Sequence, residues 1–350
     1  MLVALAAPTP ALADSVRDQQ WHLGFMHVTE AQRISQGEGV LVAVADTGVA
    51  ATVPELAGAV VPGKDFGGNT GDGTRDPAGH GTAMATLIAG HGRGTGKGVL
   101  GIAPRATILP IQLSPDFVFA MGYARDVAAA IDYAVSKGAK VICLSIGSGD
   151  ADIVRTAITK ALAADVVVVA AAGNKPDVGS VDFPAKVPGV VAVGAVDRNG
   201  DRAAISVAGP ELTLVAPGVD ITAVDAEGRT RIGTGTSDAN ALVVGAVALI
   251  RAKYPQLKGP EVVRRLTETA QDKGEPGKDP VYGYGVIDLV KALTADITPA
   301  PTSASPSPPA ATGAGGGRTA AVLAAISAAV VVMVLIAVLQ IIIRSRRRRP

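Results

Sequence analysis

Four polar side chains have the types and positions that acyl-transfer chemistry requires. They are Asp46, His80, Asn174 and Ser237. A serine hydroxyl can act as a nucleophile, a histidine as a general base, a carboxylate as the group that orients the base, and an amide as a donor to an oxyanion. Each residue alone also has an ordinary structural explanation, as a turn residue or a helix N-cap. Together they predict the active site of an acyl-transfer enzyme.

The segments around these residues predict an α/β domain. Short apolar runs bounded by Gly, Pro or Asp predict strands at 40–45, 107–113, 140–146, 166–171 and 189–196. Helical spacing and composition predict helices at 83–89, 121–136, 153–163 and 242–252. Strands that alternate with helices are typical of a mostly parallel sheet with helices on both faces. Ligands bind such sheets beyond the carboxyl ends of the strands, where Asp46 and Asn174 stand.

The sequence blocks around these residues resemble those of the subtilisin-family serine proteases, the subtilases. An Asp-Thr-Gly run begins at Asp46, Gly-His-Gly-Thr surrounds His80, and Gly-Thr-Ser ends at Ser237. Their order along the chain is the order of subtilisin. The resemblance extends through 183–196 and covers nearly all of residues 37–297. It implies a subtilisin-like fold and an endopeptidase that cleaves protein or peptide substrates.

The same resemblance implies a role for each residue. Ser237 corresponds to the nucleophile, His80 to the general base, Asp46 to the carboxylate that orients the base, and Asn174 to a donor of the oxyanion hole. The residues that resemble the edge segment pairing with bound peptide are Ser145, Ile146 and Gly147. We expect no cofactor and no metal ion. Asp65, Asp72 and Asp76 are interpreted as solvated loop residues, because their spacing matches no calcium loop.

The chain departs from the subtilase pattern directly after the nucleophile. Where subtilases usually continue with Met or Phe, two alanines and a proline, this chain has Asp238, Ala239, Asn240 and Ala241. A carboxylate at a helix N-terminus stabilises the helix but opposes negative charge forming on the substrate. This departure favours an alternative interpretation, a catalytically weak or inactive subtilase-fold scaffold that stabilises a membrane secretion complex.

The C-terminal part of the sequence predicts a membrane anchor. Residues 298–319 are rich in Pro, Ser and Gly and predict an extended linker. The 24 residues of 320–343 carry no charge. As a helix they are ~36 Å long, enough to span a bilayer. Five arginines within 344–350 predict a basic cytoplasmic tail, and therefore an extracytoplasmic catalytic domain on a single-pass cell-membrane protein.

The layout as a whole is similar to that of the mycosins, the membrane-anchored subtilases associated with type VII secretion. Residues 1–13 resemble the end of a secretory signal peptide. Residues 14–36 form an N-terminal extension whose apolar side chains, Trp21 among them, predict docking onto the catalytic domain at 37–297. The resemblance implies a type VII secretion membrane complex as a partner. The branch is divergent, because mycosins commonly carry disulfides and this chain has a single cysteine.

Charge and cysteine content exclude other classes of protein. The 350 residues carry a net charge of +1, but without the five C-terminal arginines 27 basic side chains face 31 acidic ones, a net charge of −4. A chain body of that sign does not indicate nucleic-acid binding. Cys143 lies in an apolar run and is predicted to be a small buried hydrophobic residue.

Overall fold

The structure, a computed structural model, describes residues 15–68, 70–114 and 121–297. The predicted signal remnant, linker, transmembrane helix and basic tail lie outside these residues. Within the described ranges, none of the helices combines the length and the apolar character that crossing a bilayer needs.

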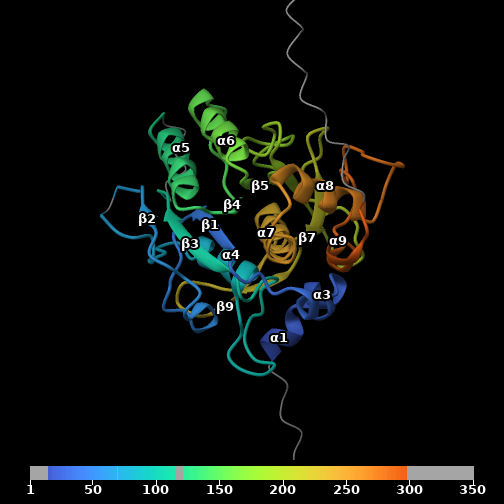
Figure 1. Ribbon diagram of the computed structural model, residues 1–350, viewed down its shortest axis with the longest axis horizontal. Coiled ribbons are helices and arrows are strands. Elements are labelled where there is room, and N and C mark those ends of the chain that lie inside the picture. The colour runs from blue at the N-terminus through green and yellow to red at the C-terminus, as the bar shows by residue number, and fades with distance from the viewer. Residues whose placement is uncertain (1–14, 69, 115–120, 298–350) are drawn as a thin grey trace, which may run out of the picture. The chain divides into compact units, whose positions relative to one another are not determined.

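Within the described residues, seven parallel strands form the central sheet (Figure 1). In their order across the sheet they are β2 (Lys64–Asp65), β3 (Thr107–Gln112), β1 (Leu41–Asp46), β4 (Val141–Leu144), β5 (Val167–Ala171), β6 (Val191–Val196) and β7 (Leu214–Pro217). A separate antiparallel pair consists of β8 (Ile221–Val224) and β9 (Thr230–Gly233). The predicted mostly parallel sheet is confirmed.

Helices cover both faces of this sheet, as the sequence predicts. Those of the main body are α4 (His80–Ala89), α5 (Met121–Ser136), α6 (Asp152–Ala163), α7 (Thr236–Lys253), α8 (Gly259–Thr269) and α9 (Leu289–Thr294), with a short 3-10 helix, η1 (Pro54–Leu56). Figure 1 shows α5 and α6 together, apart from α4 and α7. One apolar core joins α5 and α6 to the sheet, and a second joins α4, α7, α8 and α9 to its other face.

Strand β1 shows how the sheet serves both cores. Val42 and Val44 belong to the core under α4 and α7, while Ala43 and Ala45 belong to the core under α5 and α6. Successive side chains of a strand point to opposite faces, so a strand covered on both sides is apolar throughout. The first polar residue after this run is Asp46, at the carboxyl end of the strand.

Two helices begin earlier than the sequence predicts. Helix α4 begins at His80 rather than near 83, and α7 begins at Thr236 rather than near 242. Their first turns hold polar residues that show no apolar periodicity, yet these turns are buried against the sheet and its loops. Because the helices extend further, both His80 and Ser237 lie in the first turn of a helix.

The N-terminal extension forms three short helices that pack on the main body. They are α1 (Ser15–Gln19), α2 (Trp21–Phe25) and α3 (Val28–Ile34). The Gln20 side chain donates to the carbonyl oxygen of Leu100 at 3.0 Å and accepts from its amide at 2.8 Å. Trp21 Nε1 donates to the carbonyl oxygen of Val219 at 3.0 Å, and the side chain of Met26 is buried in the core.

Candidate active site

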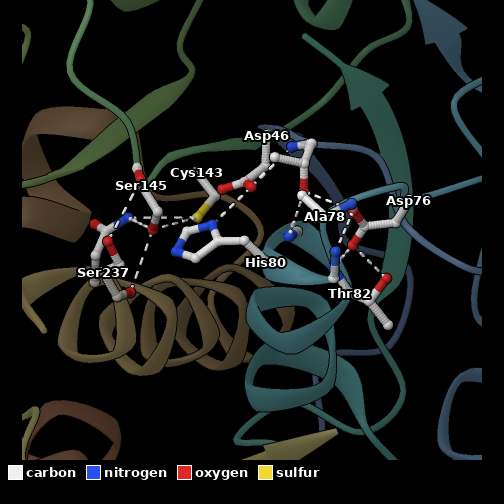
Figure 2. A network of polar contacts seen from close by, with 12 residues as sticks. Asp46, Asp76, Ala78, His80, Thr82, Cys143, Ser145 and Ser237 are labelled. Carbon is white, nitrogen blue, oxygen red and sulfur yellow. Dashed lines mark hydrogen bonds and ion pairs between the residues drawn. The ribbon is translucent and has the colours of Figure 1, made fainter. Parts of the chain in front are cut away.

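The end of β1 and the start of α4 bring a carboxylate and an imidazole together. Asp46 Oδ1 lies 2.7 Å from His80 Nδ1 (Figure 2). Gly81 permits this approach, since a Cβ on it would overlap the carbonyl oxygen of Gly48 and lie 3.0 Å from the Cβ of Asp46. The glycine that follows the histidine is therefore a steric requirement of the pair.

This pair stabilises the protonated imidazole. The Asp46 carboxylate raises the pKa of His80, burial lowers it, and the Asp238 carboxylate adds a smaller increase. Asp46 is 1% exposed, and its Oδ1 also accepts a hydrogen bond from the amide of Thr47 at 2.8 Å. With Nδ1 held by Asp46, the opposite ring nitrogen, Nε2, is the one left to exchange a proton in the cleft.

Asp76 corrects our interpretation of a solvated loop residue. It is buried, and its carboxylate accepts hydrogen bonds from Thr47 Oγ1 at 2.7 Å and from Thr82 Oγ1 at 2.6 Å (Figure 2). It also accepts from the amide of Gly79 at 2.8 Å. Asp76 thus ties the turn after Asp46 to the first turn of α4. Asp65 is buried too, whereas Asp72 is exposed as expected.

Ser237 and His80 line one cleft of about 610 Å³. The serine is the second residue of α7, so its backbone amide points from a helix N-terminus, where negative charge is stabilised. Its hydroxyl donates to the carbonyl oxygen of Ser145 at 3.4 Å, and no hydrogen bond among the described residues joins it to His80. Proton transfer to His80 therefore requires the serine hydroxyl to exchange this bond for one to His80, a realignment that is common when substrate binds.

Asn174 presents an amide donor to the same cleft. It follows β5, and its Oδ1 accepts hydrogen bonds from the amide and the hydroxyl of Thr236 at 2.9 and 3.1 Å. Within the described part of the chain its Nδ2 has no hydrogen-bond partner, and Asn174 lines the cleft beside Ser237. An amide held by its oxygen and free at its nitrogen has the arrangement that an oxyanion donor needs.

We expect Asn174→Ala to lower kcat by about 10²- to 10³-fold and to change KM little. An oxyanion donor stabilises the transition state by that factor and hardly stabilises the bound substrate. Steady-state kinetics on a peptide substrate measure the effect. Asn174→Asp is the matched variant, because it keeps the oxygen that accepts from Thr236 and loses the donor. An active Asn174→Asp enzyme would contradict the donor role and assign Asn174 to the positioning of Thr236.

The segment after β4 forms a wall of the cleft. The lining residues include Ser145, Ile146 and Gly147. Asn240 Nδ2 donates to Ser145 Oγ at 3.0 Å, and Ser145 Oγ donates to the carbonyl oxygen of Ser237 at 3.2 Å. Asn240, part of the unusual sequence after Ser237, thus ties the helix that carries Ser237, α7, to this wall. Cys143, whose Sγ lies 3.4 Å from Asn240 Nδ2, is buried as predicted, and burial raises the pKa of its thiol to about 12.

Comparison with known proteins identifies the family. The model of the subtilase family, peptidase S8, matches residues 37–285. The chain belongs to the subtilase family. It is a subtilisin-family serine protease, and the predicted subtilisin-like fold and resemblance to the mycosins are confirmed.

Relatives of two kinds resemble this subtilase. Subtilisin DY of Bacillus licheniformis is 37% identical over 73% of this chain and 92% of its own length. Mycosin-1 of Mycobacterium tuberculosis is 33% identical over 86% of this chain and 79% of its own. A chain in the structure of the periplasmic assembly from the ESX-5 inner membrane complex is 28% identical, with a TM-score of 0.71 over 85% of this chain and 89% of that one.

Asp238 places a second carboxyl group beside the predicted catalytic residues of this subtilase. It is 2% exposed, and no described residue forms a hydrogen bond with its Oδ1. Burial raises its pKa to about 6, although Arg231 and His80 favour the charged form. The ionised carboxylate therefore costs free energy in the folded protein, and the cost arises as the pH passes from the unfolded pKa to the raised folded one.

We expect Asp238→Asn to stabilise the protein by about 2 kcal/mol at pH 8 and by much less at pH 4. The reason is that at pH 4 the folded carboxyl is protonated and the unfolded one is only partly ionised, whereas at pH 8 both are ionised and the folded one bears the full cost of burial. Urea denaturation of wild type and variant at the two pH values measures the difference. An equal effect at both pH values would show that Asp238 is not destabilised by its charge.

Proposed function

We propose that this subtilase is a membrane-anchored, extracytoplasmic serine endopeptidase of mycosin type that acts beside a type VII secretion complex. The observation that carries the proposal is the 2.7 Å contact between Asp46 and His80, at a cleft that Ser237 and Asn174 also line. This arrangement supports an acyl-transfer site built from residues that the chain separates by up to 191 positions, from Asp46 to Ser237.

In this mechanism the Ser237 hydroxyl attacks the carbonyl carbon of a peptide bond and His80 takes up its proton. Asp46 stabilises the resulting imidazolium and keeps Nδ1 bonded, which directs the proton to Nε2. Asn174 Nδ2 and the backbone amide of Ser237 donate to the oxyanion. His80 then protonates the leaving amine. A water molecule that gives its proton to His80 attacks the acyl-enzyme, and His80 returns the proton to Ser237 as the acid product leaves.

The proposed membrane setting is supported by sequence and likeness. The apolar span at 320–343 and the arginines after it indicate an anchor with a cytoplasmic tail. Mycosin-1 and the chain of the ESX-5 periplasmic assembly are both similar to this protein over most of its length. Helices α1 to α3 bind residues such as Leu100 and Val219, which do not line the cleft, so the docked extension leaves it open.

A second candidate function is a scaffold in which hydrolysis is dispensable. The buried Asp238 carboxylate beside the nucleophile and the bond of the Ser237 hydroxyl to Ser145 favour it. Complementation of a deletion strain with Ser237→Ala separates the two functions, with N-terminal mapping of exported proteins as the readout. Cleaved termini that need Ser237 support the protease, and full secretion with unchanged termini in the variant supports the scaffold.

A further inference from the structure

A gap between two glycines opens the active-site cleft onto an acidic side chain. Gly147, after β4, and Gly173, after β5, line the cleft together with Asp182. A Cβ on Gly147 would lie 3.3 Å from Asp182 Oδ2, and a Cβ on Gly173 would lie 3.3 Å from the Cβ of Asp182. Side chains at either glycine would therefore crowd Asp182, and their absence leaves its carboxylate open to the cleft.

The Asp182 carboxylate has no structural partner in the part of the chain that the structure describes. Within the described residues it forms neither a hydrogen bond nor an ion pair, and it is only partly exposed. The backbone of Asp182 is held without it, by a bond from its amide to the carbonyl oxygen of Ala172 at 2.8 Å. Turn aspartates elsewhere in the chain, such as Asp197 and Asp225, accept bonds from nearby backbone amides. Asp182 does not, so turn formation does not explain its carboxylate.

The charges around the cleft leave this carboxylate uncompensated. The described residues that line the cleft include two acids, Asp177 and Asp182, and neither lysine nor arginine. Two cations lie close by, since Arg155 stacks on Phe183 and Lys186 is in the same segment, but both form ion pairs with Asp150. A cationic group entering from the cleft is therefore the missing partner.

The position of the gap says which residue of a substrate supplies that cation. Gly173 and Asn174 are consecutive, and Asn174 is the proposed donor to the carbonyl oxygen under attack. The side chain nearest to the gap therefore belongs to the residue that carries this carbonyl group. We propose that Asp182 makes this subtilase select a lysine or arginine on the amino side of the scissile bond.

This inference rests on the proposed protease function and names its substrate class. The apolar stem of a lysine or arginine packs along Ile146 and Val178, which line the same cleft, while the charged end reaches Asp182. An uncharged side chain would shield the carboxylate from water without pairing it. Such binding is disfavoured, because an unpaired polar group loses its hydration without gaining a partner. We expect a preference of about 10- to 100-fold in kcat/KM for a basic over an apolar residue.

The test uses the full chain and internally quenched peptides that differ only at this position, with Arg, Lys, Leu or Glu. Wild type should cleave the Arg and Lys peptides about 10- to 100-fold faster than the Leu peptide, and the Glu peptide slowest. Asp182→Asn should lose most of this preference, mainly through a lower kcat/KM for the Arg and Lys peptides. Asp132→Asn is the matched control, because Asp132 is an exposed acid on α5 and its loss removes the same charge. Equal rates on Leu and Arg peptides, or a preference retained in Asp182→Asn, would overturn the inference.

Binding of p-aminobenzamidine, an aromatic cation, tests the same residue without hydrolysis. In the Ser237→Ala background we expect binding that weakens at least 10-fold when Asp182→Asn or Asp182→Ser is added. Unchanged binding in both double variants would overturn the role of Asp182. If wild type cleaves none of the peptides but binding still depends on Asp182, the proposed protease function fails, and Asp182 keeps its role as the group that binds a cationic side chain.

Discussion

Replacement of Ser237 by alanine should abolish peptide-bond hydrolysis while leaving the fold intact. In subtilisin, loss of the corresponding serine lowers kcat by about 10⁶-fold, and we expect a loss of that order here. Among the described residues the side chain makes one long hydrogen bond, to the carbonyl oxygen of Ser145 at 3.4 Å, so its removal should cost little stability. Cleavage of a fluorogenic peptide and the thermal denaturation midpoint measure the two effects.

Ser136→Ala controls for the loss of a serine hydroxyl, because Ser136 is exposed at the end of α5 and its hydroxyl donates to the carbonyl oxygen of Tyr133 in the same helix. It should keep wild-type activity. A Ser237→Ala protein that hydrolyses peptides at more than a few per cent of the wild-type rate would mean that another group is the nucleophile.

Asp46→Asn should lower kcat by about 10⁴-fold, the effect of the same change in another serine protease with this triad. Asn can place an NH₂ group against His80 Nδ1, which favours the imidazole tautomer with its proton on the wrong nitrogen. The imidazolium also loses the carboxylate that is the main cause of its raised pKa. Steady-state kinetics with saturating peptide measure the change in kcat.

The pH profile checks the cause of that loss. His80 acts as a base only when neutral, so wild-type activity should rise as the pH passes upward through its raised pKa. Without the Asp46 charge that pKa falls, and the acidic limb of the residual kcat/KM should move to lower pH. An unmoved limb would mean that the observed ionisation does not belong to the Asp46–His80 pair.

Short-range sequence patterns predicted the parts of the site that strands and motifs position. The apolar run of β1 ends at Asp46, and the Gly-His-Gly block marks both His80 and the glycine that lets α4 approach β1. The sheet and its two helical layers followed from the alternation of apolar runs. The helix starts were less accurate, because the first turns of α4 and α7 are buried through tertiary packing rather than through their own apolar pattern.

Other parts of the site depend on contacts between distant segments. Asp76 was interpreted as solvated because its partners, Thr47 and Thr82, are identified only once β1 and α4 are adjacent. Its place four residues before His80 was the one sequence feature that could have indicated a role for Asp76 in the site. Asp182 carried a signal too, as an acid between Val181 and Phe183 in an apolar segment. That it faces a cleft depends on Gly147 and Gly173, which lie on other segments.

The central claim is that Ser237 and His80 act as one proton-transfer unit, and active-site labelling tests it most directly. The full-length protein and its His80→Ala variant are reacted with a fluorophosphonate, and the adduct is located by mass spectrometry. We predict a single adduct on Ser237 in wild type and at least 10³-fold slower labelling without His80. Folded wild type that labels on another residue, or at the same rate as His80→Ala, would contradict the claim.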